Sequence, residues 1–188
     1  MSAASSGEAH IHGAVVLDQR KAYAEIVGTD VLEAAIDSLP EDRQREYREV
    51  LAVGWIRCTT VAAVVEAVAR RVGRDPLELD AVVVRKGVER TFGTLWRVLL
   101  RLASDAQIVT RAPVLYGKTY DKGSFTAHLL GPGHAECRLV DFPEITELDL
   151  QGLGIGVVEA LKISGRSDVR HVATRTKDGA RIEVRWRI

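Results

Sequence analysis

The chain has little of several residue types that mark specialised classes of protein. Its 188 residues include two cysteines, one methionine and 5% aromatic residues. Two cysteines are too few for a disulfide scaffold. Lys plus Arg and Asp plus Glu both number 26, so there is no positive excess of the kind that nucleic-acid binding requires. No run of about 18 uncharged apolar residues occurs, so the sequence predicts no membrane span.

The remaining composition is that of a globular domain. Hydrophobic residues make up 46% and charged residues 28%, which are ordinary proportions for such a domain. We predict one α+β domain over residues 10–188, preceded by a disordered Ser/Ala-rich tail at residues 1–9. That tail lacks the basic start and apolar centre of a signal peptide. Cys58 and Cys137 are far apart and have no CxxC spacing, which favours free thiols over a zinc site. We therefore expect a cytoplasmic protein.

The N-terminal half is predicted to be one strand followed by a block of helices. Apolar residues at helical spacing define the helix at residues 59–72, and Asp75-Pro76-Leu77-Glu78 is a strong helix-start signal. The predicted elements are a strand at 10–17 and helices at 18–27, 31–39, 40–54, 59–72, 76–102 and 104–116. The helix at 76–102 is either continuous or broken near Gly87 or Gly93.

The C-terminal part changes to the alternating pattern of strands. Residues 125–130 and 135–142 form one predicted hairpin, and residues 169–176 and 181–188 form a second around Asp178-Gly179. A helix at residues 148–163 lies between the two hairpins. The predicted architecture is an N-terminal strand and helical block packed on a twisted antiparallel sheet of two hairpins with one intervening helix.

Motifs that carry chemistry are weak in this chain. The glycines of Gly152-Leu153-Gly154-Ile155-Gly156 lack the preceding parallel strand of a dinucleotide loop, so they indicate a closely packed helix instead. His10 and His12 alternate on one predicted strand, and Cys137 follows His134 by three residues. Neither pair is a recognisable metal site or catalytic dyad. We predict no catalytic residue, no metal site and no cofactor.

Apolar and aromatic residues suggest a pocket, and small residues suggest a partner surface. Tyr and Trp combine an apolar body with a polar tip, which suits a site for a small amphiphile, although an ordinary core also explains them. The pocket hypothesis rests on Trp55, Phe92, Trp96, Leu99, Tyr116 and Tyr120. The partner-surface hypothesis rests on the Gly-rich helix, at Gly152, Gly154, Ile155 and Val158, where small residues permit close approach.

Short motifs in a consistent order also carry a family resemblance, from about Trp96 to Trp186. The motifs are Leu99-Leu100-Arg101-Leu102-Ala103-Ser104, Arg111-Ala112-Pro113, Tyr116, Tyr120-Asp121-Lys122-Gly123, Leu130-Gly131-Pro132-Gly133, Phe142-Pro143 and Ile182-Glu183-Val184-Arg185-Trp186. This part of the chain resembles a myxobacterial paralogous family of unknown function. That family is similar to four-vinyl-reductase domains, haem–nitric-oxide-binding domains and Bet-three-type vesicle-tethering subunits.

The resemblance implies helices on one side of a twisted antiparallel sheet, often with an apolar pocket and often in dimers. It carries over no catalytic residue. The haem-binding relatives use a Tyr-x-Ser-x-Arg signature and a histidine on a helix. Here the corresponding stretch reads Tyr116-Gly117-Lys118-Thr119-Tyr120, and the histidines fall on predicted strands or turns. Residues 174–181 also lack the cysteines that hold zinc in four-vinyl-reductase relatives.

Three functions remain open. The preferred one is a non-enzymatic signalling module that binds a small apolar ligand, a protein partner or both. The second is a purely structural homodimerisation domain with a filled core. An enzyme, either a thiol hydrolase at Cys137 or a metal enzyme using His10 and His12, is the third, and haem-based sensing is a minor alternative.

The zero net charge is an average over unlike segments. Residues 134–161 hold one basic and six acidic groups, a net of −5, whereas residues 162–188 hold eight basic and three acidic groups, a net of +5. The basic terminal hairpin either meets an acidic partner or neutralises the acidic segment of its own chain. We favour self-neutralisation, and nucleic-acid binding and membrane insertion stay excluded.

Overall fold

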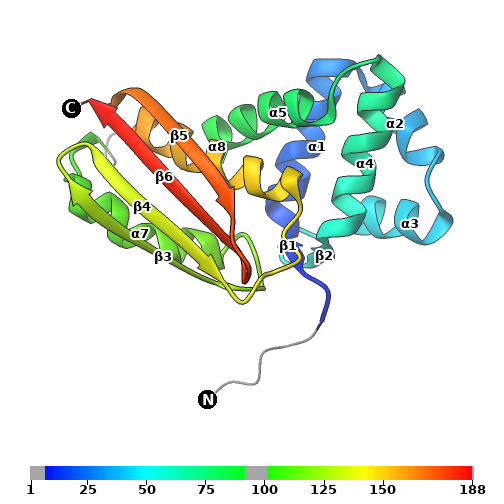
Figure 1. Cartoon of the computed structure of the whole chain (residues 1–188). Helices are drawn as coiled ribbons and strands as arrows, with labels where there is room; N and C mark the ends of the chain where they lie inside the picture. Colours follow the sequence, from blue (N-terminus) through cyan, green and yellow to red (C-terminus); the bar gives the residue numbers. More distant parts are fainter. Residues whose placement is uncertain (1–6, 92–100, 188) are drawn as a thin grey trace.

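The N-terminal half forms a helical block closed at one end by a small two-stranded sheet. The computed structural model describes residues 7–91 and 101–187. Strand β1 (His10–His12) pairs antiparallel with β2 (Trp55–Arg57). The helices of this block are α1 (Gly13–Val27), α2 (Thr29–Asp37), α3 (Glu41–Glu49), α4 (Cys58–Val72) and α5 (Pro76–Thr91). In Figure 1 the block occupies the right of the molecule.

The C-terminal half is a four-stranded antiparallel sheet with helices on one face. Helix α7 (Asp105–Gly117) precedes β3 (Ser124–Gly131) and β4 (His134–Val140), and α8 (Glu147–Ile163) precedes β5 (Ser167–Arg175) and β6 (Ala180–Arg187). The strand order is β3-β4-β6-β5, with α7 and α8 behind the sheet in Figure 1. This arrangement confirms the predicted α+β architecture of two hairpins with one intervening helix.

The inward face of the sheet follows the alternation of the sequence. Ala135, Cys137 and Leu139 of β4 are buried, and Cys137 lies opposite Ile182 of β6. The alternate residues face outward, where the Glu136 carboxylate pairs with the guanidinium groups of Arg138 and Arg181. Because side chains alternate along a strand, one face of the sheet contributes to the core and the other carries ion pairs.

The first strand is shorter than predicted. Residues 13–17 were expected to continue it, but α1 begins at Gly13. An added Cβ at Gly13 would lie 2.0 Å from the Leu51 carbonyl oxygen, and the Gly13 N–H donates to the Gly54 carbonyl at 2.8 Å. The tight approach of the chain before β2 therefore determines where α1 begins. A short run of apolar residues cannot distinguish a strand from a buried helix by itself.

Local capping signals predicted other helix ends better. Gly73 has φ of 66° and ends α4 in the left-handed conformation. The Asp75 carboxylate accepts the Glu78 N–H at 3.0 Å at the start of α5. Ser104 and Gln107 form a reciprocal capping box at α7. Helix α3 ends at Glu49, however, earlier than the predicted end near Gly54.

No described helix has both the length and the apolarity needed to cross a membrane.

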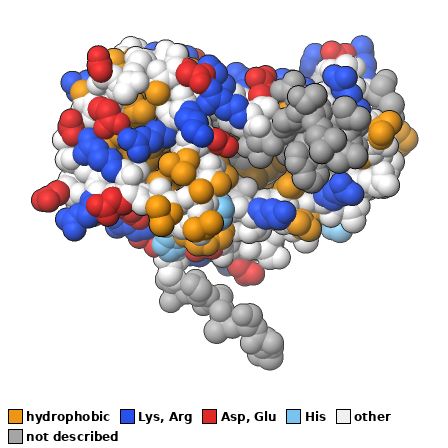
Figure 2. Space-filling model, turned by 180° about the vertical axis from the view of Figure 1, so that it is seen from behind, with side chains coloured by type: hydrophobic (Ala, Val, Ile, Leu, Met, Phe, Trp, Pro, Cys, Tyr) orange, Lys and Arg blue, Asp and Glu red, His pale blue; other side chains and the backbone are white. Residues whose placement is uncertain are grey.

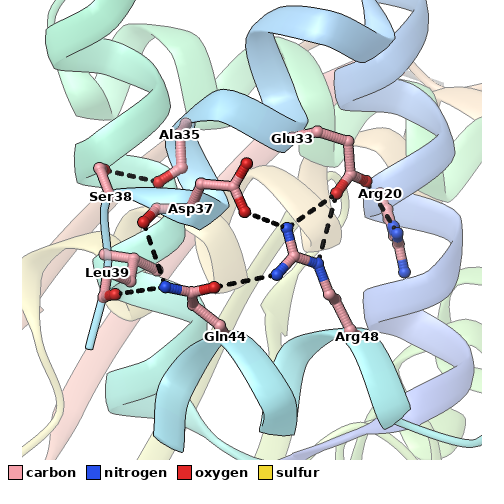
Figure 3. Close-up of polar contacts among 8 residues, drawn as sticks. All are labelled: Arg20, Glu33, Ala35, Asp37, Ser38, Leu39, Gln44 and Arg48. Atoms are coloured by element: carbon pink, nitrogen blue, oxygen red, sulfur yellow. Dashed lines mark hydrogen bonds and ion pairs between the residues drawn. The ribbon is translucent and has the colours of Figure 1, made fainter. Parts of the chain in front are cut away.

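Arg48 joins α3 to α2 through a polar network (Figure 3). Its guanidinium donates to the Glu33 carboxylate at 3.1 Å and to the Asp37 carboxylate at 2.6 Å. The Gln44 side-chain amide donates to the Asp37 and Leu39 carbonyls, which lie at the C-terminal end of α2. Arg20 of α1 also reaches Glu33, at 2.9 Å. Three helices are thereby held together on the far side of the block from the sheet.

The charged segments pair within the chain. Arg181 of the terminal hairpin meets Glu136 and Glu183, Arg185 meets Glu183 at 2.9 Å, and Lys162 meets Glu159 at 2.8 Å. These contacts agree with self-neutralisation of the basic hairpin.

The predicted tail contacts the domain at its last residue. Ala9 is 4% exposed, and its carbonyl accepts the Cys58 N–H at 2.9 Å.

Candidate functional site

A large cavity lies where the helical block meets the sheet. Its volume is about 770 Å³, within the range of roughly 300–1,000 Å³ typical of small-molecule sites. Residues from α1, α4 and α5 line it on one side, and residues from α7, α8, β3, β4 and β6 line it on the other. The core of this chain is therefore not completely filled, and the space lies between its two structural layers.

Most of the lining is apolar, and the cavity reaches the surface. Val61 and Val65 of α4, Val84 of α5 and Val157 of α8 are among its walls. Trp55 and Leu115 also line it and are 44% and 42% exposed. Seen from behind, hydrophobic side chains gather near the middle of the molecule (Figure 2).

One end of the cavity is formed by stacked aromatic rings. The Tyr116 ring lies 4.9 Å from the Phe125 ring and 5.3 Å from the Tyr120 ring, centroid to centroid. The Tyr116 hydroxyl donates to the Lys122 carbonyl at 2.6 Å. Burial raises the pKa of both tyrosines, so both phenols stay protonated at neutral pH. The backbone N–H of His12 donates to the Thr119 carbonyl, and Thr119 follows Lys118 in the chain.

Asp80 of α5 brings a buried carboxyl group to the cavity wall. It is 7% exposed, and its Oδ1 accepts a hydrogen bond from the Tyr23 hydroxyl at 3.3 Å. Its Oδ2 faces α8 at Gly152, where an added Cβ would lie 3.5 Å away. Burial raises the pKa of Asp80 to about 7, and the nearby Asp149 carboxylate adds to the increase. Among the described residues no cation pairs with this carboxyl group.

Asp149 is a second acid at the cavity, and its side chain is hydrogen-bonded at the start of α8. Thr146 is the N-cap of α8, and its hydroxyl donates to the Asp149 carboxylate at 2.6 Å while accepting the Asp149 N–H at 3.1 Å. The Thr146 hydroxyl thus caps the helix, and the Asp149 side chain is hydrogen-bonded to that cap. Burial raises the pKa of Asp149.

The structure brings three of the six predicted pocket residues together. Trp55, Tyr116 and Tyr120 all line the cavity. Phe92, Trp96 and Leu99 lie outside the described residues. The proposal that these six side chains bind a ligand stays a prediction.

The Gly-rich helix packs inside its own chain. Gly154, Ile155 and Val158 are buried, and an added Cβ at Gly154 would lie 2.5 Å from the His171 ring of β5. Gly152 faces Asp80 of α5. The close approach expected of this helix is thus made to α5 and β5 within the chain, and Gly152 is half-buried. That these four residues form a partner surface stays a prediction.

The residues considered for catalysis do not assemble. His134 and Cys137 are three residues apart on β4 and point to opposite faces of the sheet. His134 contacts Glu183 at 2.9 Å on the outer face, while Cys137 is 3% exposed in the core. Burial raises the pKa of the Cys137 thiol to about 11, so the reactive thiolate is disfavoured. The geometry removes the thiol-hydrolase alternative.

His10 and His12 also have separate surroundings. The His10 ring contacts the Asp121 carboxylate at 2.8 Å, whereas the His12 ring packs edge-on against Trp55 with centroids 5.0 Å apart. Within residues 7–91 and 101–187, no three His, Cys, Asp or Glu side chains are grouped so that they would hold a metal ion.

Comparison with known proteins adds the fold relationship. No family model matches the chain, and no curated protein matches its sequence. Among solved structures it is similar to an unliganded H-NOX protein mutant from K. algicida, with TM-score 0.70 and 7% identity over 94% of this chain and 97% of that one. An H-NOX protein from S. oneidensis in the Fe(II)NO ligation state gives 0.69 and 10% over 94% and 99%. An oxygen-binding H-NOX domain related to soluble guanylate cyclases gives 0.65 and 15% over 93% of each chain.

The chain has the fold of the H-NOX domains. This supports the haem–nitric-oxide-binding branch of the resemblance seen in the sequence. Identities of 7–15% show a shared fold and do not transfer a ligand. The likeness to a myxobacterial family has no matching family model behind it and stays a prediction.

The H-NOX fold raises the question of haem, and the cavity residues do not fit it. All five histidines of the chain lie in strands, so no helix offers an imidazole to an iron. Of the other axial ligand types in the lining, Cys137 is held as a neutral thiol and the Tyr116 hydroxyl donates to the Lys122 carbonyl. Burial raises the pKa of Tyr120, which disfavours its phenolate. His12 lines the cavity but packs against Trp55.

The charges along the cavity disagree with haem as well. A haem carries two anionic propionates, which need cations or other strong donors near them. Among the described lining residues, three carboxyl groups face a single lysine side chain: Asp18, Asp80 and Asp149 against Lys118. The H-NOX-like fold therefore encloses a cavity whose chemistry differs from that of a haem site.

Sequence reasoning missed Asp80. It stands in Leu79-Asp80-Ala81-Val82-Val83, where Leu79 and Val83 are both fully buried. An acid beside the apolar stripe of a helix was the available signal, because a charge is rarely buried without a partner.

Proposed function

We propose that this chain is a non-enzymatic signalling module that binds a small, largely apolar ligand between its helical block and its sheet. The observation that carries the proposal is the cavity of about 770 Å³ with its apolar walls and surface opening. A ligand there would touch α1, α4 and α5 on one side and α7, α8 and the sheet on the other. Binding would favour one relative position of the two layers, which is how a ligand biases a conformational equilibrium.

The test is binding of decanol, a neutral apolar probe, measured by calorimetry. Ala112 lines the cavity from α7, and Ala112→Phe places an aromatic ring in the space. Ala106 is exposed in the first turn of the same helix, so Ala106→Phe is the matched control. We expect Ala112→Phe to weaken decanol binding by about tenfold or more and Ala106→Phe to change it by less than about twofold. Absence of decanol binding to the unmodified protein would overturn the proposal.

Haem is the second candidate, because the structural neighbours are H-NOX proteins, one of them in an Fe(II)NO state. The cavity residues argue against it, and visible absorption distinguishes the two candidates. The protein is purified from cells supplied with a haem precursor and also titrated with hemin. We expect no stoichiometric complex with a sharp Soret band. A one-to-one complex that is lost in His12→Ala would establish haem as the ligand instead.

A further inference from the structure

We propose that the cavity takes an apolar amine, whose ammonium group binds the Asp80 carboxylate while its apolar body fills the space between α4, α8 and the sheet. This inference rests on the proposed function and names the chemical class of its ligand. The juxtaposition that carries it is a buried carboxyl group, without a cation among the described residues, on the wall of a mostly apolar cavity.

The first step is the incomplete hydrogen bonding of Asp80. An ionised carboxylate has about four acceptor positions, and burying it without partners is costly. Within the part of the chain that the structure describes, its one hydrogen-bond partner is the Tyr23 hydroxyl, at a long 3.3 Å from Oδ1. Among the described residues, Oδ2 has no hydrogen-bond donor and no cation within ion-pair distance. A ligand that brings an N–H donor would complete the site.

The second step is the sign of the charge that the cavity favours. Asp18 and Asp149 also line the cavity, and Asp18 has Lys21 3.6 Å away at the surface. The basic side chains that line it, Lys118 and His12, lie near β1. The Tyr23 hydroxyl donates to Asp80, and Tyr23 lies about three turns along α1 from His12. The Asp80 region is therefore acidic, and it favours a cation and repels an anion.

The third step is the choice of an organic cation over a metal ion. A hard divalent cation needs about six oxygen ligands. Val84 of α5 and Gly152 of α8 lie close to Asp80, and the nearby Asp149 carboxylate is already held by Thr146. These groups offer too few oxygen ligands for such an ion, whereas a free carboxyl group beside mostly apolar walls suits a ligand with a single ammonium group and a hydrocarbon body.

The test compares three probes with equal chain length: decylamine, decanol and decanoate, each below its micelle-forming concentration. We expect decylamine to bind about tenfold or more tightly than decanoate at pH 7.5, with decanol between them. Asp80→Asn keeps the shape and the hydrogen bond from Tyr23 but removes the charge. It should leave decanol binding unchanged and bring decylamine and decanoate to within about twofold of each other. Asp30→Asn, at an exposed acid in the first turn of α2, is the control and should keep the full preference.

A second variant keeps the test decisive if Asp80→Asn fails to fold. Tyr23→Phe removes the hydroxyl whose hydrogen bond lowers the pKa of Asp80. Less of the carboxyl group is then ionised at pH 7.5, so the preference for decylamine over decanoate should fall while decanol binding stays unchanged. If decanol binds but decylamine and decanoate bind equally, the amine inference fails and the proposed ligand-binding function stands. If none of the three probes binds, the proposed function itself fails.

Discussion

Asp80 shows how a buried carboxyl group can be left with few hydrogen bonds by the packing of its own helix. The Leu79 and Val83 side chains on either side of it are fully buried, so the helix cannot turn Asp80 to water without exposing them. The carboxyl group instead accepts a hydrogen bond from the Tyr23 hydroxyl, and burial raises its pKa so that it keeps its own proton to higher pH. The folded state thus holds a proton at a pH at which an exposed aspartate would have lost it.

This predicts a pH-dependent difference between the protein and Asp80→Asn. The folded pKa of Asp80 is about 7, against an ordinary value of 3.8. The folded state therefore binds more protons than the unfolded chain between those values, and the free energy of unfolding falls as pH rises through that window. Relative to the unmodified protein, Asp80→Asn should gain on the order of 2–4 kcal/mol on going from about pH 4 to pH 8.

Urea unfolding at a series of pH values measures this difference. The raised pKa of Asp149 gives a slope of the same sign, and the lowered pKa of His171 gives an opposing one. His171 is present in both proteins, so its effect cancels in the comparison. Asp149 is coupled to Asp80, so the measured difference belongs to this pair of acids. A constant difference across this pH range would contradict the assignment.

Arg166 is a second residue whose role depends on contacts distant in sequence. Its guanidinium donates to the Asp105 carboxylate at 2.7 and 2.9 Å and to the Ala103 and Ser164 carbonyls. Both charged side chains are nearly buried, at 10% and 15% exposed. We expect Arg166→Met to lower the free energy of unfolding by about 3–5 kcal/mol, because it leaves a buried carboxylate unpaired.

Arg187→Met is the control for Arg166→Met. Arg187 pairs with Asp168 at the surface and is 80% exposed, so its loss should cost less than about 0.5 kcal/mol. Chemical unfolding of the two variants measures both effects. Equal losses would show that the Arg166–Asp105 pair contributes no more than a surface contact.

Neither role is evident from neighbouring residues in the sequence. Asp80 resembles any helical acid until its surroundings are known, and Arg166 lies 61 positions from its partner. The aromatic residues were easier to identify, because Tyr116 and Tyr120 occur at helical spacing and a buried aromatic ring signals a core or a pocket from its type alone.

At the scale of elements, α8 shows why glycines in one helix are not equivalent. An added Cβ at Gly154 would meet the His171 ring at 2.5 Å, whereas one at Gly156 would meet nothing within 4 Å. Gly156→Ala should therefore raise the free energy of unfolding by about 0.5–1 kcal/mol, since alanine restricts the unfolded chain.

Gly154→Ala should lower that free energy by about 1–2 kcal/mol, because the ring of β5 must move away from α8. Thermal unfolding distinguishes the two variants. In a double-mutant cycle, His171→Ala should relieve part of the loss caused by Gly154→Ala. A stabilising Gly154→Ala would show that α8 and β5 are not closely packed.

Elements were predictable where a local signal defines their ends. Gly73, Asp75 and Ser104 act within a few residues, so the helix ends that they mark follow from the sequence. The start of α1 does not, because it depends on the approach of Gly13 to the Leu51 carbonyl. That contact joins segments about forty positions apart, so no local capping motif predicts it.

At the scale of the whole molecule, the two hairpins were predictable but their order in the sheet was not. Turn signals define each hairpin, whereas the β4–β6 pairing that joins them depends on packing against α7 and α8. The cavity is a property of the same scale, since its walls come from helices and strands throughout the chain. A pocket can be suspected from aromatic residues, but its volume and its buried acid emerge only when the layers meet.

Because the cavity lies between those layers, an occupant should stabilise the fold as a unit. A ligand that binds only the folded state at about 100 times its Kd adds about 2.7 kcal/mol to the free energy of unfolding. For a chain of this size that is a rise in Tm of about 5–10 °C. We expect decylamine to produce this shift in the unmodified protein and a much smaller one in Ala112→Phe at the same concentration. A rise that was equal in both proteins would place the binding site elsewhere, because Ala112→Phe changes the cavity and leaves the rest of the surface as it is.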